Sequence, residues 1–324
     1  MTVSDAVILI PAQAIEASSP CLFWPGEPDE SLAFSLARLG QMEPVLVERQ
    51  GEGFSLVAGA RRLAVLTDLG RPVLAREVEA TDLEKGLLYL STNAARPLTD
   101  GMRFAALRYF HMLLTESELT NFVAPLMGLS PQGRDIRLLL AWFNLPDAFD
   151  PALMSGRLPL AAGEPLSRMT REEQEAVLPF FATLAWSRGS AVNFLTWILE
   201  AARAREMSAS EILAQGGFYP ILSEEGLSPK DAITALTALA RAARYPALFR
   251  LETEAVRLGR EICAGTAFRL TRPDQFETPA VELTVRVAGP GPLSRATADF
   301  QKIAASPLWD RLFNLAEAPA EPEA

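Results

Sequence analysis

The sequence has little cysteine and histidine, and these scarcities exclude several classes of site. Its two cysteines, Cys21 and Cys263, lie far apart and form no C-x-x-C pattern. This argues against a disulfide scaffold, a zinc site and an iron–sulfur site, and it fits a reducing cytosol. The single histidine, His111, lies in the apolar stretch LRYFHMLL. That setting predicts a packed or capped helix residue and not the base of a Ser-His-Asp or Cys-His mechanism.

The sequence also lacks a membrane-spanning segment and a basic region that would bind nucleic acid. No apolar run approaches the roughly 18 residues of a membrane helix, and no basic region followed by an apolar core opens the chain. We therefore expect no membrane span and no signal peptide, and a cytoplasmic protein. The formal net charge is −10, and no third of the chain is net positive. The basic face typical of non-specific nucleic-acid binding is thus missing.

What is present is an ordinary globular composition, with 49% hydrophobic residues in 324. The first hundred residues predict a small α/β domain, 1–99. Its expected strands lie at 44–49, 54–59 and 73–78, and the glycine-containing turn 50–53 makes the first two a hairpin. Its expected helices begin at Ala60 and at Asp82, the first of them stopped by Gly70 and Pro72.

The rest of the chain completes an α+β, multidomain prediction. Residues 100–215 are expected to be all-helical, with a helix-turn-helix layout in 118–146. Residues 216–316 predict an α-β-β-α domain with helices at 229–244, 247–263 and 293–314 and strands at 266–271 and 280–287. Residues 317–324 are expected to be a disordered tail.

The stretch LVAGARRLAVLTDLG, residues 56–70, raises the question of function. Arg61 and Arg62 fall in the first turn of the expected helix, where the helix dipole disfavours cations. A glycine before a helix lets backbone N–H groups approach an anion, and arginines there can hold phosphate oxygens bidentately. One interpretation is therefore a phosphate site. The other is an exposed arginine pair that is solvated or paired with nearby carboxylates.

Four segments resemble, in one order, the ParB family of partition proteins. They are GQMEPVLVERQGEGFSLVAGARRLAVLTDLG, STNAARPLT, VAPLMGLSPQGRDIRLLLAWFNLP and MSGRLPLAAGEPLSRMTREEQEAVL. Together they cover roughly residues 38–180. The resemblance implies a ParB/sulfiredoxin-like domain, a helix-turn-helix domain and a C-terminal dimerisation domain, hence a homodimer.

The resemblance also implies a nucleotide site for CTP with Mg²⁺ in the first domain, used to close a clamp on DNA. Asn93 lies where the family has its metal-binding asparagine, and Arg96 where it has a phosphate-contacting arginine. The nucleotide-site residues implied in this way are Gly40, Glu43, Pro44, Gly59, Ala60, Arg61, Arg62, Asn93 and Arg96.

Three departures from the family pattern bear on chemistry. Ala60 replaces the acidic residue of the family's G-E-R-R, Thr92 replaces the glutamate before the asparagine, and Glu43 replaces a glutamine. Since Mg²⁺ prefers anionic oxygen ligands, we expect nucleotide binding with weak or absent hydrolysis. Ala60 also excludes sulfiredoxin chemistry, which needs a cysteine there. A nucleotide-dependent kinase would have Glu43 as its sole catalytic carboxylate, and no carboxylate cluster suits a nuclease.

The helix-turn-helix segment implies contacts with double-stranded DNA. Ser130, Gln132, Arg134 and Arg137 are its candidate DNA-binding residues, although the segment is longer than is usual in the family. The resemblance further implies a Walker-type ATPase of the ParA kind as partner, a role in chromosome segregation and an association with the nucleoid. The alternative is a degenerate scaffold that keeps the fold and binds a protein partner.

Overall fold

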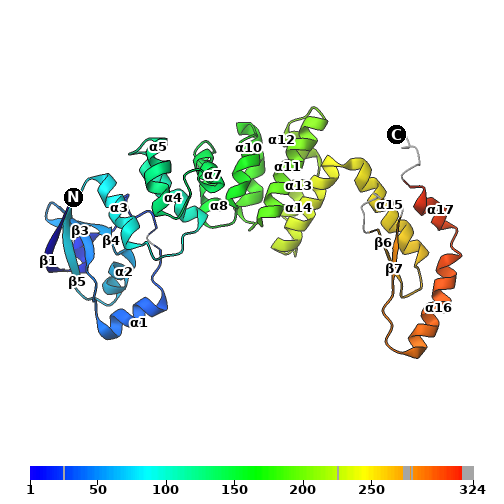
Figure 1. Cartoon of the computed structure of the whole chain (residues 1–324), viewed down its shortest axis with the longest axis horizontal. Helices are drawn as coiled ribbons and strands as arrows, with labels where there is room; N and C mark the ends of the chain where they lie inside the picture. The colour runs from blue at the N-terminus through cyan, green and yellow to red at the C-terminus, as the bar shows by residue number, and fades with distance from the viewer. Residues whose placement is uncertain (25, 225, 273–277, 279, 316–324) are drawn as a thin grey trace.

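The computed structural model describes residues 1–315 except 25, 225, 273–277 and 279. Along the longest axis, Figure 1 shows an N-terminal sheet with its helices, then a row of helices, then a smaller C-terminal part with two short strands. The predicted α+β class is therefore correct. The division into domains at 99, 215 and 316 stays a prediction, and the expected tail 317–324 lies outside the described residues.

The N-terminal sheet is mixed, with the strand order β1-β5-β3-β4-β2. Its strands are β1 (Thr2–Ile10), β2 (Ile15–Glu16), β3 (Val45–Gln50), β4 (Gly53–Ala58) and β5 (Val73–Glu79). The helices of this part are η1 (Ala12–Ala14), α1 (Glu30–Leu39), α2 (Ala60–Asp68) and α3 (Asp82–Thr92). The predicted hairpin and the two predicted helices are present. The sequence patterns predict nothing before residue 44, whereas the structure adds β1, β2 and α1 there.

The β3–β4 hairpin lies at the centre of this sheet. Gln50 pairs with Gly53, so the loop has two residues, and Gly51 at its first position has a φ of 60°. A positive φ at that position suits glycine and matches the twist of the strands. Val45 and Val47 of β3 are fully buried, while Leu46 and Glu48, which alternate with them, are half-exposed. This alternation places one face of β3 on the core.

The middle of the chain is helical, as predicted. Its elements are α4 (Asp100–His111), α5 (Glu116–Glu118), the π-helical turn η2 (Leu119–Val123), α6 (Ala124–Leu126), α7 (Arg134–Trp142), η3 (Asp147–Phe149), α8 (Asp150–Met154), η4 (Leu160–Ala162), α9 (Gly163–Leu166), α10 (Arg171–Ala182), α11 (Arg188–Ala204), α12 (Ala209–Gln215) and α13 (Phe218–Leu222). The elements α5, η2 and α6 form one continuous helical segment, and α7 follows after residues 127–133. His111 ends α4 on the surface, stacked on Phe143 with the ring centroids 4.7 Å apart.

The C-terminal part departs from its prediction at two points. Its elements are α14 (Pro229–Arg244), α15 (Pro246–Ile262), β6 (Arg269–Thr271), β7 (Glu282–Thr284), α16 (Pro290–Ala304) and α17 (Leu308–Phe313). The strands are shorter than predicted, and the single helix predicted over 293–314 is wrong. Pro307 separates α16 from α17, because proline lacks the N–H of a helical hydrogen bond and disfavours the helical conformation of Ser306 before it.

The buried residues form two clusters. The larger runs from Ile10 in β1 to Ala240 in α14 and so joins the N-terminal sheet to the row of helices. The smaller contains Ala255 and Leu258 of α15, Ile303 of α16 and Leu312 of α17. In the described part of the chain, no helix has both the length and the apolar character needed to cross a bilayer. The candidate site lies beside the larger cluster.

Candidate functional site

The turn from β4 to α2 is built on Gly59. This residue has a φ of 104°, and an added Cβ would lie 2.7 Å from Cγ1 of the fully buried Val45. Both the backbone conformation and the close packing therefore require glycine. No side chain caps the N-terminus of α2, whereas Asp29 caps α1 and Thr81 caps α3. The first N–H groups of α2 thus keep the capacity to donate to an anion.

A hollow of about 240 Å³ opens at this turn. It is lined by Leu32, Glu43, Gly59, Ala60, Arg61, Arg62, Tyr89, Thr92 and Asn93. Six residues of the predicted nucleotide site are among these. The three others, Gly40, Pro44 and Arg96, do not line the hollow. Gly40 ends α1 with a φ of 78°, and Pro44 contributes its carbonyl oxygen as an acceptor for Arg62.

Arg61 has an acidic partner within the molecule. Its Nη1 lies 3.2 Å from Oδ2 of Asp29, whose side chain is 60% exposed. An exposed ion pair of this kind stabilises a protein by about 0–1 kcal/mol. The arginine is therefore paired, as the second interpretation of the sequence holds. The pair is weak enough for a more highly charged anion to displace it.

Arg62 is held more firmly. Its Nη1 donates to the carbonyl oxygens of Glu43 at 2.9 Å and Pro44 at 3.1 Å, and lies 3.3 Å from Oε2 of Glu43. Burial lowers the pKa of the Arg62 guanidinium, the Glu43 carboxylate raises it and Arg61 lowers it. Arginine stays charged under such shifts. Arg62 therefore fastens the 43–44 segment to α2 and brings a positive charge to the wall of the hollow.

Asn93 lies opposite this turn at the C-terminal end of α3. Its Nδ2 donates to the carbonyl oxygen of Tyr89 at 2.9 Å and lies 3.4 Å from Oγ1 of Thr92. Because the nitrogen is engaged, Oδ1 is the amide atom suited to a cation. Glu43 adds a carboxylate to the same hollow. Among the described residues no group of three or more His, Cys, Asp or Glu side chains is arranged to hold a metal. A Mg²⁺ ion here would rely on a ligand's own oxygens as well.

Three lining residues and one partner were not among the predicted residues: Leu32, Tyr89, Thr92 and Asp29. Leu32 lies in α1 and Asp29 caps it, and no helix was expected there. The stretch DESLAFSLARL has an N-cap aspartate before an amphipathic run, and this signal would have identified the helix. Tyr89 lies one helical turn before Asn93. Nothing local in the sequence shows that α1 packs beside α2.

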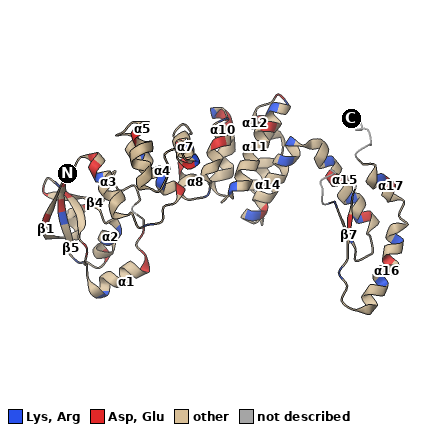
Figure 2. Ribbon diagram, in the orientation of Figure 1, with Lys and Arg blue, Asp and Glu red and all other residues tan. Residues whose placement is uncertain are grey.

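The predicted DNA-binding residues are exposed, but they do not all lie on one helix. Arg134 and Arg137 belong to α7, whereas Ser130 and Gln132 precede it. Arg134 pairs with Glu164 at 3.0 Å. Arg137 is exposed on α7. Figure 2 shows Lys and Arg interspersed with Asp and Glu along these helices, so the described segment presents no continuous basic stripe in this view.

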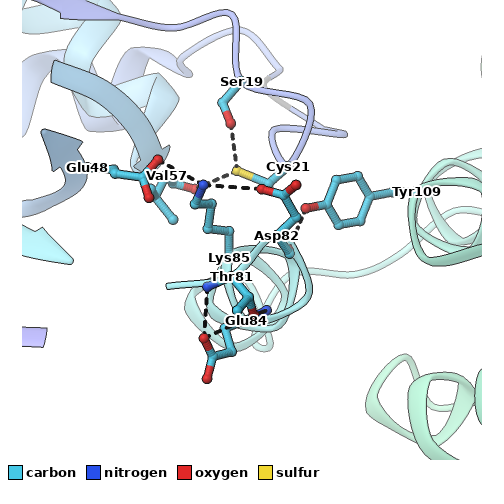
Figure 3. A network of polar contacts seen from close by, with 9 residues as sticks. All are labelled: Ser19, Cys21, Glu48, Val57, Thr81, Asp82, Glu84, Lys85 and Tyr109. Atoms are coloured by element: carbon cyan, nitrogen blue, oxygen red, sulfur yellow. Dashed lines mark hydrogen bonds and ion pairs between the residues drawn. The ribbon is translucent and has the colours of Figure 1, made fainter. Parts of the chain in front are cut away.

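A second polar cluster surrounds Cys21 (Figure 3). The Sγ of Cys21 lies 3.1 Å from Oγ of Ser19, and Lys85 pairs with Glu48 at 2.8 Å and with Asp82 at 3.2 Å. Burial raises the pKa of the Cys21 thiol, although Ser19 and Lys85 act in the opposite direction. A buried thiol with a raised pKa is a poor nucleophile. This cluster therefore fixes α3 against β3 and does not line the hollow.

No protein-family model matches the chain, and no curated protein does. The C-terminally truncated chromosome-partitioning protein ParB from Caulobacter crescentus, complexed to the centromeric parS site, is 16% identical with a TM-score of 0.34. The match covers 58% of this chain and 98% of that one. The truncated C. crescentus ParB complexed with CTP-gamma-S is 18% identical with a TM-score of 0.24, over 54% and 98% of the two chains. The chain thus resembles ParB distantly, over about half its length.

Proposed function

We propose that the chain is a ParB-like, DNA-associated protein that binds a nucleoside triphosphate, CTP with Mg²⁺, at the hollow beside Gly59. One observation carries the proposal: Gly59, Arg61, Arg62 and Asn93 come from two separate motifs and line one cavity. These are the residues to which the family resemblance assigns the phosphates and the metal. Packing alone does not require two arginines and an asparagine to share a hollow.

The charges of the hollow favour a polyphosphate. Arg61 is held by one exposed carboxylate, and Arg62 mainly by neutral carbonyl oxygens. A triphosphate offers both guanidiniums charge-assisted hydrogen bonds, each worth about 1.5–3 kcal/mol. This exceeds the roughly 0–1 kcal/mol of the Asp29 pair. The uncapped N–H groups of α2 add further donors.

Asn93 and Glu43 are the residues that would hold Mg²⁺ together with the phosphates. When bound, the ion would neutralise charge on the phosphate tail. The donor set of one amide and one carboxylate suits an ion that takes most of its ligands from water and substrate.

Weak or absent hydrolysis follows from the same lining. Ala60 and Thr92 both line the hollow, so the two carboxylates that the family has there would have faced the ligand. Without these carboxylates, no negative charge at the two positions repels the phosphates. The site also lacks two groups that could bind a metal ion or orient a water molecule. The nucleotide is then an occupant that controls conformation, and the protein is at most a slow CTP hydrolase.

The remaining features of the proposal follow the family. Double-stranded DNA would meet Ser130, Gln132, Arg134 and Arg137, and a ParA-type Walker ATPase would be the partner in segregation. Homodimerisation would use the C-terminal part. There, α15 and α16 carry exposed apolar side chains, among them Val256 (54% exposed), Leu293 (56%) and Phe300 (49%). Size-exclusion chromatography with light scattering tests the dimer directly.

The test of the nucleotide site is equilibrium binding of labelled CTP to the full chain with Mg²⁺, with and without duplex DNA. We expect saturable binding that weakens about tenfold in Arg61→Ala. The matched control is Arg76→Ala, whose arginine pairs with Asp5 outside the hollow. No detectable CTP binding by the wild type with DNA and Mg²⁺ present would refute the proposal.

A scaffold that binds a protein partner is the second candidate. The net charge of −10 and the ion pairs that Glu164 makes with Arg134 and Arg168 favour it. Mobility-shift assays over a range of salt separate the two, because phosphate contacts give an affinity that falls steeply with salt. A kinase is disfavoured, since its sole candidate catalytic carboxylate, Glu43, is 84% exposed and thus not shielded from water.

A further inference from the structure

A second hollow, of about 210 Å³, lies where the N-terminal sheet region meets the row of helices. Its wall includes Trp24 from the N-terminal loop, Asn93 and Arg96 from the segment after α3, and Arg103 from α4. Met127 and Gly128, which follow α6, also line it. The hollow therefore joins four parts of the chain, one of them the turn of the helix-turn-helix.

Asn93 lines both hollows. Sites for small molecules usually have volumes of about 300–1,000 Å³. The first hollow, at about 240 Å³, and the second, at about 210 Å³, each fall below this range. The two together fall within it. A ligand of nucleotide size therefore needs more room than the first hollow offers, and the second hollow, which shares Asn93, can supply it.

The second hollow is also positively charged. Arg96 donates from Nη1 to the carbonyl oxygen of Trp24 at 3.4 Å, and in the described part of the chain it has no carboxylate partner within 4.0 Å. Arg103 lies 3.4 Å from Oδ1 of Asp100 and donates from Nε to the carbonyl oxygen of Met127, also at 3.4 Å. These bonds are long and therefore weak. Two half-buried guanidiniums thus face a small cavity with weak partners.

We propose that the two hollows form a single site for a nucleoside triphosphate, in which Arg103 of α4 contacts the ligand together with Arg96. This rests on the proposed nucleotide function and extends it to a residue that none of the family motifs includes. Arg103 also donates to the carbonyl oxygen of Met127. The same side chain would therefore contact both the ligand and the turn of the helix-turn-helix.

The experiment is isothermal titration of CTP with Mg²⁺ into the full chain and its variants. Arg103→Ala is expected to bind about tenfold more weakly than the wild type, since a charge-assisted contact is lost. The matched control is Arg108→Ala in the same helix, whose arginine pairs with Asp147 and Asp150 outside the hollow. It is expected to bind within about twofold of the wild type.

A second pair of variants keeps the test independent of the folding role of Arg103. Ala94 lines the second hollow and is exposed, so Ala94→Glu adds a negative charge there without removing a contact. We expect Ala94→Glu to weaken CTP binding about tenfold and the size-matched Ala94→Gln to change it little.

The outcomes separate the two proposals. If Arg61→Ala weakens binding while Arg103→Ala and Ala94→Glu bind like the wild type, the first hollow acts alone and the inference is overturned. If the wild type binds no CTP, the proposed function itself fails and the inference with it.

Discussion

Replacement of Gly59 by alanine tests the architecture of the site in both stability and function. A left-handed backbone costs an alanine about 1–2 kcal/mol. At Gly59 the new methyl would also lie 2.7 Å from Cγ1 of Val45, which cannot move away because it is fully buried. Overpacking of this kind costs about 1–3 kcal/mol. We therefore expect Gly59→Ala to lower the free energy of unfolding by about 2–5 kcal/mol.

Gly217 provides a matched control for this substitution. It precedes α13 with φ 72° and ψ 24°, close to the ψ of 25° at Gly59, and an added Cβ there meets nothing within 4 Å. Gly217→Ala should therefore show only the backbone cost of about 1–2 kcal/mol.

The assay is urea unfolding followed by circular dichroism, with CTP titration of each folded variant. Gly59→Ala should be the less stable of the two and should bind CTP more weakly, because the clash with Val45 displaces the start of α2. Equal losses for both variants would refute the packing argument. An unchanged CTP affinity in Gly59→Ala would show that the β4–α2 turn does not position the residues that bind CTP.

Three further predictions concern charge. Hydrogen bonding to the Thr81 N–H, with help from the N-terminus, lowers the pKa of Glu84 from 4.5 to about 2. The Glu84 carboxylate therefore stabilises the fold above pH 4.5, and this stabilisation is lost as the pH falls towards 2. Glu84→Gln should flatten the pH dependence of the urea midpoint between these values. An unchanged pH dependence there would contradict this. Arg137→Ala should weaken duplex DNA binding and reduce the slope of log K against log salt by about 1, and an unchanged slope would remove Arg137 from the interface. The double variant Ala60→Glu, Thr92→Glu should raise Mg²⁺-dependent CTP hydrolysis, measured by phosphate release. No gain would show that the loss of these two carboxylates does not limit hydrolysis.

Local signals predicted the part of the fold that carries the site. The hairpin, the glycine before α2 and the start of α3 each follow from turn chemistry or periodicity within a few residues. The single helix predicted over 293–314 is wrong because Pro307 interrupts an otherwise helical pattern. The missed α1 did have a capping signal at Asp29.

The pairing of the arginines was beyond local prediction. Asp29 meets Arg61 only because α1 packs beside α2, and Glu43 meets Arg62 only because the segment before β3 lies against the α2 turn. Such contacts depend on tertiary packing between segments distant in sequence. The family motif predicted that Arg96 and Asn93 belong to one site. In the structure both line the second hollow, whose other wall is formed by the row of helices.

The most direct test of the central claim compares Asp29→Asn with Arg61→Ala in CTP binding. Asparagine can keep the cap on α1, where Oδ1 accepts from the Leu32 N–H at 2.7 Å, while the charge that competes for Arg61 is removed. If the arginine is there to bind phosphate, Asp29→Asn should bind CTP about two- to fivefold more tightly than the wild type, and Arg61→Ala about tenfold more weakly. If neither substitution changes the affinity, or if the wild type shows none, the turn beside Gly59 does not bind a polyphosphate.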